Sequence, residues 1–175
     1  MELLKAIATR HSTRQFKDKQ ITNQELEAVL LAGNASGVAM GQYDCMHMTV
    51  VQNRDLLNKI NDAGAKAMNN PNAKPIYNAP TIVVLSAPVY DRMPGAEFAN
   101  VGCVMQNMLL MATDLGVGSV YLLGFIAGFR AAPELLSELE IPEGFKPLAA
   151  IGLGYPLEPL VEREITTKIA KNIIL

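Results

Sequence analysis

The sequence predicts one globular domain in which a β-sheet is covered by helices, of either the α/β or the α+β class. Helix-type and strand-type patterns alternate along the 175 residues without an internal repeat or a low-complexity linker. Residues 81–85 form a continuous apolar run, which is typical of a strand buried on both faces. Residues 101–115 carry apolar side chains around most of a helical cylinder, which predicts an almost wholly buried helix.

The other elements follow in chain order. A short helix near the N-terminus has an apolar face made of Leu3, Leu4 and Ile7. The capping-box pattern Thr22-x-x-Glu25 begins a second helix, for which Gly33 is the expected stop. Gly116 is expected to end the buried helix as a left-handed C-cap. We also expect strands at 46–51, 117–123 and 148–153, and helices that begin near 56 and span 133–139.

Composition narrows the class of protein. Half of the residues are hydrophobic, 18% are charged, and the net charge is -2. Intrinsic disorder is therefore excluded, and binding to nucleic acid through broad positive charge is disfavoured. We expect a cytoplasmic protein, since no signal peptide or membrane-spanning stretch is visible. A small domain this apolar is also expected to need a partner surface.

Residues 10–14, with the sequence Arg-His-Ser-Thr-Arg, are the main candidate for a binding site. Arginine side chains can hold phosphate oxygens through paired hydrogen bonds, and hydroxyl groups can complete the shell. The alternative is a solvated basic helix end, where arginine interacts favourably with the helix dipole. The residues alone leave both interpretations open.

Other sites of chemistry have weaker support. The sequence contains no P-loop, no dinucleotide-binding glycine motif and no nucleophile elbow. His47 in a predicted strand and Cys103 in the apolar helix are expected to be structural, and Cys45 has no adjacent cation. No metal site is expected, because neither cysteine belongs to a ligand cluster. A cofactor with its own reactivity therefore fits better than catalysis by side chains.

An ordered set of motifs runs through nearly the whole chain. It begins with Leu4-x-x-Ile7-x-x-Arg10-His11-Ser12-Thr13-Arg14-x-Phe16 and a helix start, Ile21-x-x-x-Glu25-Leu26. It continues with Ala35-Ser36-Gly37, Asn78-Ala79-Pro80, Gln106-Asn107, Leu115-Gly116-Val117-Gly118-Ser119 and Gly152-x-Gly154-Tyr155-Pro156. In this order and spacing, the motifs resemble those of the nitroreductase-type FMN flavoproteins.

The resemblance implies an α+β fold: a three-layer sandwich with a central, mostly antiparallel sheet flanked by helices, in an intertwined homodimer. Residues 1–175 would form a single FMN-binding domain. Arg10, His11 and Ser12 would hold the phosphate and ribityl end of FMN, and Arg14 would lie near the pyrimidine edge of the ring. The loop Ala35, Ser36 and Gly37 would come from the other subunit. The segment Tyr121, Leu122, Leu123 and Gly124 would pass along the ring.

The late cation on the phosphate would be Arg163, with Lys168 as the substitute and a surface ion pair as the alternative for Arg163. The sequence also departs from the family. Met40 and Gly41 stand where many members have an asparagine and a tryptophan, and Leu123 replaces an acidic residue found in some. The inserted lid that follows the buried helix in longer members is absent.

The implied function is that of an FMN-dependent oxidoreductase. NADH or NADPH would pass hydride through the flavin to a small-molecule acceptor such as a nitroaromatic, a quinone or a flavin, in a ping-pong reaction. No side chain would act as an acid or a base. The alternative is a non-catalytic FMN-binding carrier or sensor. Partners other than a second copy, including nucleic acid and membranes, are not expected.

Overall fold

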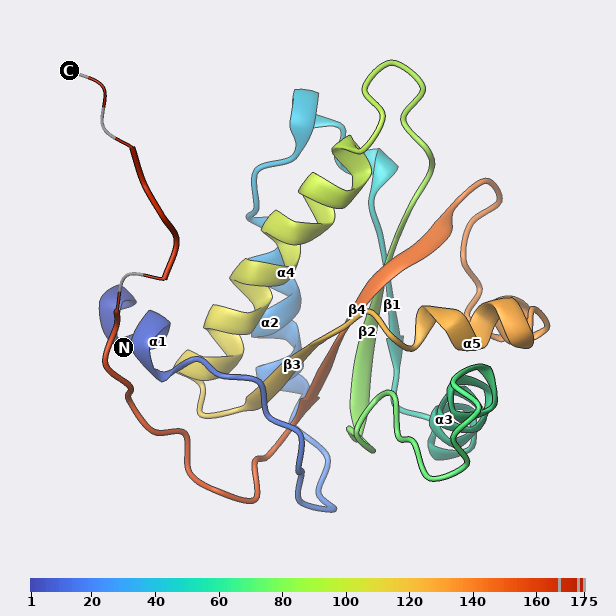
Figure 1. Ribbon diagram of the computed structural model, residues 1–175, viewed down its shortest axis with the longest axis horizontal. Coiled ribbons are helices and arrows are strands. Elements are labelled where there is room, and N and C mark those ends of the chain that lie inside the picture. Colours follow the sequence, from blue (N-terminus) through green and yellow to red (C-terminus); the bar gives the residue numbers. More distant parts are fainter. Residues whose placement is uncertain (167, 173, 175) are drawn as a thin grey trace.

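A central antiparallel sheet organises the protein in the computed structural model, which describes residues 1–166, 168–172 and 174 (Figure 1). Among these residues, four strands form the sheet, in the order β1-β2-β4-β3. Their bounds are His47–Val51 (β1), Thr81–Ala87 (β2), Gly118–Leu122 (β3) and Lys146–Gly154 (β4). All three strand pairs are antiparallel. The α+β class is therefore confirmed.

Helices cover both faces of the sheet. One side carries α1, α2 and α4, and the other carries α3, α5 and α6 (Figure 1). The helices are Leu3–Thr9 (α1), Asn23–Asn34 (α2), Arg54–Ala67 (α3), Ala96–Asp114 (α4), Ile126–Ala131 (α5) and Leu135–Glu138 (α6). Two short 3₁₀ turns, Ala39–Gly41 (η1) and Tyr43–Cys45 (η2), follow α2.

Strand β2 contributes side chains to two hydrophobic cores, one on each face of the sheet. Every residue of β2 is buried, as the apolar run predicted. Because side chains alternate along a strand, Val83 and Leu85 face the core beneath α2 and α4, whereas Ile82 and Val84 face the core beneath α3 and α5. The sheet is thus the middle of three layers.

The ends of α2 and α4 test three predicted helix signals, of which two are confirmed. Thr22 and Glu25 form the predicted capping box at the start of α2. Gly33 is not the stop, because it lies inside α2, where its small size lets Met108 and Met48 approach closely. The predicted left-handed conformation of Gly116, with φ 72°, is confirmed beyond the end of α4.

Several boundaries differ from the expectations. Helix α4 begins at Ala96 rather than at 101, and it is not wholly buried, since Cys103 and Phe98 are exposed. Helix α5 was not predicted. Its Gly128 is a poor helix former, but a Cβ there would lie only 2.8 Å from the Gly64 backbone nitrogen, so close packing against α3 holds it. The helix expected at 133–139 is limited to α6.

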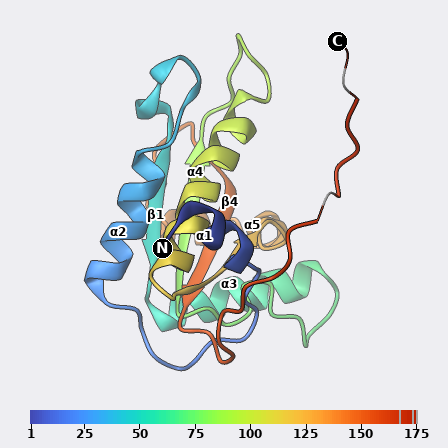
Figure 2. The same ribbon diagram turned by 90° about the vertical axis from the view of Figure 1, so that its left-hand side faces the viewer.

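Helix α1 leaves its predicted apolar face exposed. It buries Ala6, Ala8 and Thr9. The three side chains of the predicted apolar face are exposed instead, with Leu3 and Leu4 more than two-thirds exposed. Figure 2 shows α1 on the outer side of α4. A single chain therefore leaves this apolar face uncovered.

Candidate functional site

The segment after α1 is held against the edge of the sheet. Arg10 leaves the helix with an extended backbone, at φ -62° and ψ 121°. The Thr13 N–H then donates a hydrogen bond of 2.9 Å to the carbonyl of Ser119, in β3. Ser12 and Ser119 form a parallel bridge. Since β3 is the outer strand, it can pair with this segment, which presents the predicted cluster beside the sheet.

Arg10 and Arg163 come together at this point, although they lie near opposite ends of the sequence. The Arg163 N–H donates to the Ala8 carbonyl at 3.2 Å, and its guanidinium donates to the Ile7 carbonyl at 3.3 Å. Burial lowers the pKa of Arg10, and the positive charge of Arg163 lowers it further. Across the described residues, neither arginine belongs to an ion pair with a carboxylate. Two neighbouring cations without a carboxylate suit an anion.

Arg14 lies beside a cavity at the end of β3. Its guanidinium carbon is 5.6 Å from the centroid of the Tyr77 ring. Tyr77 lines a cavity of about 280 Å³ together with Met68, Ala73, Lys74, Pro75, Tyr121, Leu122, Leu123 and Gly124. Arg14 therefore contacts one wall of a cavity whose lining includes all four residues predicted along the ring. Burial raises the pKa of Tyr121, which keeps its hydroxyl protonated.

The two remaining members of the basic cluster are accessible. His11 and Ser12 are partly buried. The His11 Nδ1 lies 3.1 Å from the Thr9 carbonyl, so this bond orients the imidazole. Both residues directly follow Arg10 on the segment that runs beside β3.

Thr13, the remaining member of the 10–14 cluster, and two residues that the sequence did not single out also contribute to the site. Thr13 is buried against Gly118, where a Cβ would lie 2.8 Å from the threonine methyl. The buried hydroxyls of Thr13 and Ser119 have no hydrogen-bond partner among the residues that the structure describes. Tyr77 and Lys74 line the cavity from the turn before β2. Asn78-Ala79-Pro80 was the only sequence signal near that turn, and it does not include either residue.

The loop Ala35, Ser36 and Gly37 lies elsewhere on the same chain. Ser36 is buried, and its hydroxyl accepts a 2.8 Å hydrogen bond from Asn107. The following turn is tied to Asn100, near the start of α4. Residues 10–14 instead lie near the opposite end of α4, where the N-terminus contacts Asp114. Ser36 itself bonds Asn107 and the Cys103 carbonyl, near the middle of α4, so it lies roughly 10 Å along the helix axis from the end of α4 at Asp114.

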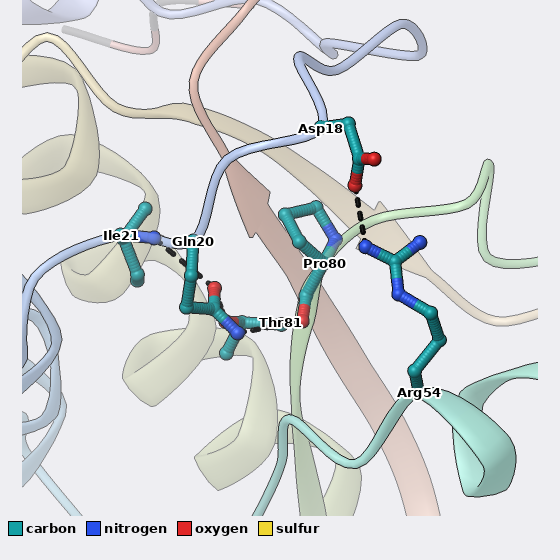
Figure 3. Close-up of polar contacts among 6 residues, drawn as sticks. All are labelled: Asp18, Gln20, Ile21, Arg54, Pro80 and Thr81. Carbon is teal, nitrogen blue, oxygen red and sulfur yellow. Dashed lines mark hydrogen bonds and ion pairs between the residues drawn. The ribbon is translucent and has the colours of Figure 1, made fainter.

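A polar cluster ties the N-terminal segment to the start of β2 (Figure 3). Gln20 accepts a 2.6 Å hydrogen bond from Thr81 and donates to the Pro80 carbonyl at 3.0 Å. Asp18 and Arg54 form an ion pair beside it. The cluster borders a separate cavity of about 320 Å³. Because these side chains bond one another, the cluster holds the backbone that follows Arg14.

Two expectations about single residues can be checked directly. Cys103 is exposed, so the expectation that this apolar helix is almost wholly buried is wrong at this residue. His47 is partly buried in β1, with its ring in edge contact with Phe145, as a structural residue would be.

Lys168 is exposed. Of the hydrophobic tail 173–175, only Ile174 falls within the described residues; Ile173 and Leu175 lie outside them.

Comparison with known proteins identifies the family. The model of the nitroreductase family matches residues 7–155. The chain belongs to the nitroreductase family. A relative from Archaeoglobus fulgidus, named "Putative NADH dehydrogenase/NAD(P)H nitroreductase", is 33% identical over 156 residues, which cover 89% of this chain and 86% of the relative. The resemblance drawn from the ordered motifs is thus confirmed.

Solved structures of nitroreductases share the fold. The nitroreductase with bound FMN from Bacteroides fragilis superposes with a TM-score of 0.83 at 29% identity, covering 100% of this chain and 99% of that one. The nitroreductase with bound FMN from Desulfitobacterium hafniense gives a TM-score of 0.86 at 22% identity, covering 99% and 100%. The nitroreductase-like three-layer sandwich is therefore confirmed.

The described residues form neither a membrane-spanning helix nor a cluster of metal ligands. In the part of the chain that the structure describes, no helix is long and apolar enough to cross a bilayer. No group of three or more histidine, cysteine, aspartate or glutamate side chains there could hold a metal ion.

Proposed function

We propose that this nitroreductase-family chain is an FMN-dependent oxidoreductase that takes electrons from NADH or NADPH. The observation that carries the proposal is the pair of cations Arg10 and Arg163, with Arg14 further along the same segment at a cavity. Both solved relatives described above contain bound FMN, and the Archaeoglobus relative carries an NAD(P)H nitroreductase name. The proposal combines the geometry of this site with the cofactor and the activity that the names of these relatives give.

The residues fit the parts of FMN. A phosphate monoester carries close to two negative charges at neutral pH, and Arg10 and Arg163 supply two positive charges. Ser12 and His11 add polar groups beside them. The segment Tyr121–Gly124 lines the cavity that would hold the ring, and Arg14 contacts Tyr77 in its wall. Arg163 is preferred to Lys168 because its contacts with α1 bring it beside Arg10.

The protein's part in the reaction is to bind and orient. When bound, FMN supplies the atom that accepts and releases hydride. Arg14 would place positive charge beside the ring, where it would favour the reduced state by stabilising the negative charge that builds up during reduction. The cavity is open at Leu123, which is 58% exposed, so NAD(P)H and an acceptor can reach it in turn. We therefore propose ping-pong kinetics with a small acceptor such as a nitroaromatic, a quinone or a flavin.

We further propose that the working unit is a homodimer. One chain leaves Leu3 and Leu4 of α1 exposed, together with Val161 and Ile165 of the tail that passes α1. Burial of such a surface against a second copy is favourable. Within one chain, Ser36 of the loop Ala35, Ser36 and Gly37 is bonded to the middle of α4, at Asn107 and Cys103, rather than to the segment that carries Arg10. A second copy is the source of that loop.

Purification and spectroscopy test the main proposal. The purified protein, supplied with FMN, is expected to show the visible flavin spectrum and to bleach when NADH or NADPH is added anaerobically. Readmission of an acceptor should restore the spectrum. A protein that fails to take up FMN would refute the proposal. FMN binding without reduction by either nucleotide would instead favour the carrier or sensor.

The phosphate role of Arg10 has its own test. Arg10→Ala should weaken FMN binding at least about tenfold, because it removes a charge-assisted hydrogen bond to phosphate. Riboflavin, which lacks the phosphate, should bind equally to both forms. The matched control is Arg54→Ala, since Arg54 is exposed and paired with Asp18. Equal losses for FMN and riboflavin would exclude a phosphate contact.

A further inference from the structure

The turn before β2 holds Tyr77 in an unusual backbone conformation. Tyr77 and Asn78 both have φ 53°, in the left-handed region. A residue with a bulky side chain rarely adopts this conformation unless its surroundings hold it there. Such strain is frequent at functional sites, and Tyr77 lines the cavity described above.

The buried Asn61 holds this turn. Asn61 is 3% exposed on α3. Its Oδ1 accepts a 3.2 Å hydrogen bond from the Ile76 N–H, and its Nδ2 donates a 3.1 Å hydrogen bond to the Asn78 Oδ1. These bonds clamp the residues on both sides of Tyr77. The Tyr77 N–H also donates to the Lys74 carbonyl at 2.7 Å.

Close packing against α3 secures the turn further. A Cβ on Gly64 would lie only 2.5 Å from the Cγ of Pro75. Only glycine lets the helix and the turn approach this closely. Hydrogen bonds and packing therefore both favour the turn geometry that presents the Tyr77 ring.

The ring is the partner of an otherwise free guanidinium. Arg14 is exposed, and no carboxylate among the described residues pairs with it. Its backbone is held on both sides, by the bond from Thr13 to Ser119 and by a 2.8 Å bond from the Lys17 N–H to the Tyr155 carbonyl. The contact with the Tyr77 ring, at 5.6 Å, restrains the side chain.

We propose that Tyr77 is a positioning residue for Arg14, and that Asn61 keeps Tyr77 in place. A cation is attracted to the face of an aromatic ring, and a charge held in advance stabilises a developing negative charge better than a mobile one. Tyr77 thereby raises the electron affinity of flavin bound at the cavity. This inference rests on the FMN site proposed above.

A double-mutant cycle tests the inference. Tyr77→Gly removes the ring while favouring the left-handed backbone. It should weaken the binding of reduced FMN relative to oxidised FMN by about threefold, which corresponds to one cation–π contact. Arg14→Ala should give a larger loss. The double variant should lose no more than Arg14→Ala, because the ring acts through the arginine. Anaerobic fluorescence titrations of both redox forms supply the ratios.

Three variants serve as controls. Tyr77→Phe retains the ring and should retain the wild-type ratio. Tyr77→Asn removes the ring with another residue that tolerates this backbone, in case the glycine variant does not fold. Lys19→Met removes the cation that lies 4.8 Å from the Tyr155 ring, outside the cavity, and should leave the ratio unchanged. Asn61→Ala should shift the ratio in the same direction as Tyr77→Gly.

The outcomes separate the two proposals. A wild-type protein that binds no FMN overturns the proposed function and this inference with it. FMN binding together with an unchanged ratio in both Tyr77→Gly and Tyr77→Asn overturns the positioning role alone. Additive losses in the double variant would also overturn it, because they would mean that the ring and Arg14 act independently.

Discussion

Glu25 shows how one side chain can connect distant parts of the chain. Its Oε2 accepts hydrogen bonds from the Thr22 N–H at 2.7 Å, the Thr22 hydroxyl at 2.8 Å and the Tyr155 hydroxyl at 2.7 Å. Burial alone would raise the pKa of Glu25. The hydrogen bonds from Thr22 and Tyr155, with the nearby charge of Lys19, outweigh burial and lower the pKa. The start of α2 is thereby tied to the end of β4.

This arrangement predicts a pH-dependent contribution to stability. Since the folded pKa lies below the unfolded value of about 4.3, Glu25 stabilises the fold above that pH and loses this effect as the pH falls through the folded pKa. Tyr155→Phe should therefore lower the free energy of unfolding at pH 7 by about 1 kcal/mol or less, because Glu25 is only partly buried. Urea unfolding at several pH values should show this difference shrinking below about pH 4.

The control is Tyr43→Phe. The Tyr43 hydroxyl donates to the neutral carbonyl of Ser36 at 3.1 Å, so its loss should cost a similar amount at every pH. A Tyr155→Phe difference that is equally constant with pH would show that Glu25 ionisation is not involved.

Among the elements, α4 ends in a complete C-cap motif. The N–H of Gly116 donates to the Thr113 carbonyl at 3.0 Å, and the N–H of Val117 donates to the Ala112 carbonyl at 2.8 Å. This is the Schellman pattern, and Gly116 adopts the positive φ that it requires. The sequence predicted this cap because Gly116 directly follows the apolar helical pattern.

Replacement of Gly116 tests the cap. Gly116→Ala should lower the free energy of unfolding by about 1 kcal/mol, because a Cβ disfavours the left-handed conformation. A Cβ there would meet no atom within 4 Å, so a clash would not contribute. Gly116→Asn should cost less, since asparagine tolerates this conformation. Thermal unfolding measures both variants. If Gly116→Ala and Gly116→Asn lost equal stability, the backbone explanation would be contradicted.

For the whole molecule, the exposed face of α1 makes the proposed dimer testable. Leu4→Glu should dissociate the dimer and weaken FMN binding, because it places a charge on the surface assigned to the second copy. Lys5→Glu makes a larger change in charge on the same helix, away from Leu3, Leu4 and Ile7, and should leave the assembly intact. Sedimentation velocity measures the oligomeric state. A monomeric wild-type protein with full FMN affinity would refute the dimer.

Sequence patterns predict features that depend on residues close together in the chain, but not features that depend on contacts between distant segments. The apolar run of β2 and the capping box of α2 were predictable, because residues a few positions apart determine them. Helix α5 was missed because its Gly128 gains its stability from contact with Gly64 of α3. The outward direction of Leu3 and Leu4 was missed for a related reason. Periodicity shows that an apolar face exists, but not which neighbour covers it.

The sequence by itself determined the types of most elements, the basic cluster at 10–14 and, through the order of its motifs, the family. Only the tertiary structure decided that Arg163 lies beside Arg10, that Arg14 lies against the ring of Tyr77, and that Ser36 bonds Asn107 in the middle of α4. The physical reason is that helices and strands depend on local spacing. A binding site depends on packing between segments that are distant in the chain. These segments come together only when the helices pack against the two faces of the sheet.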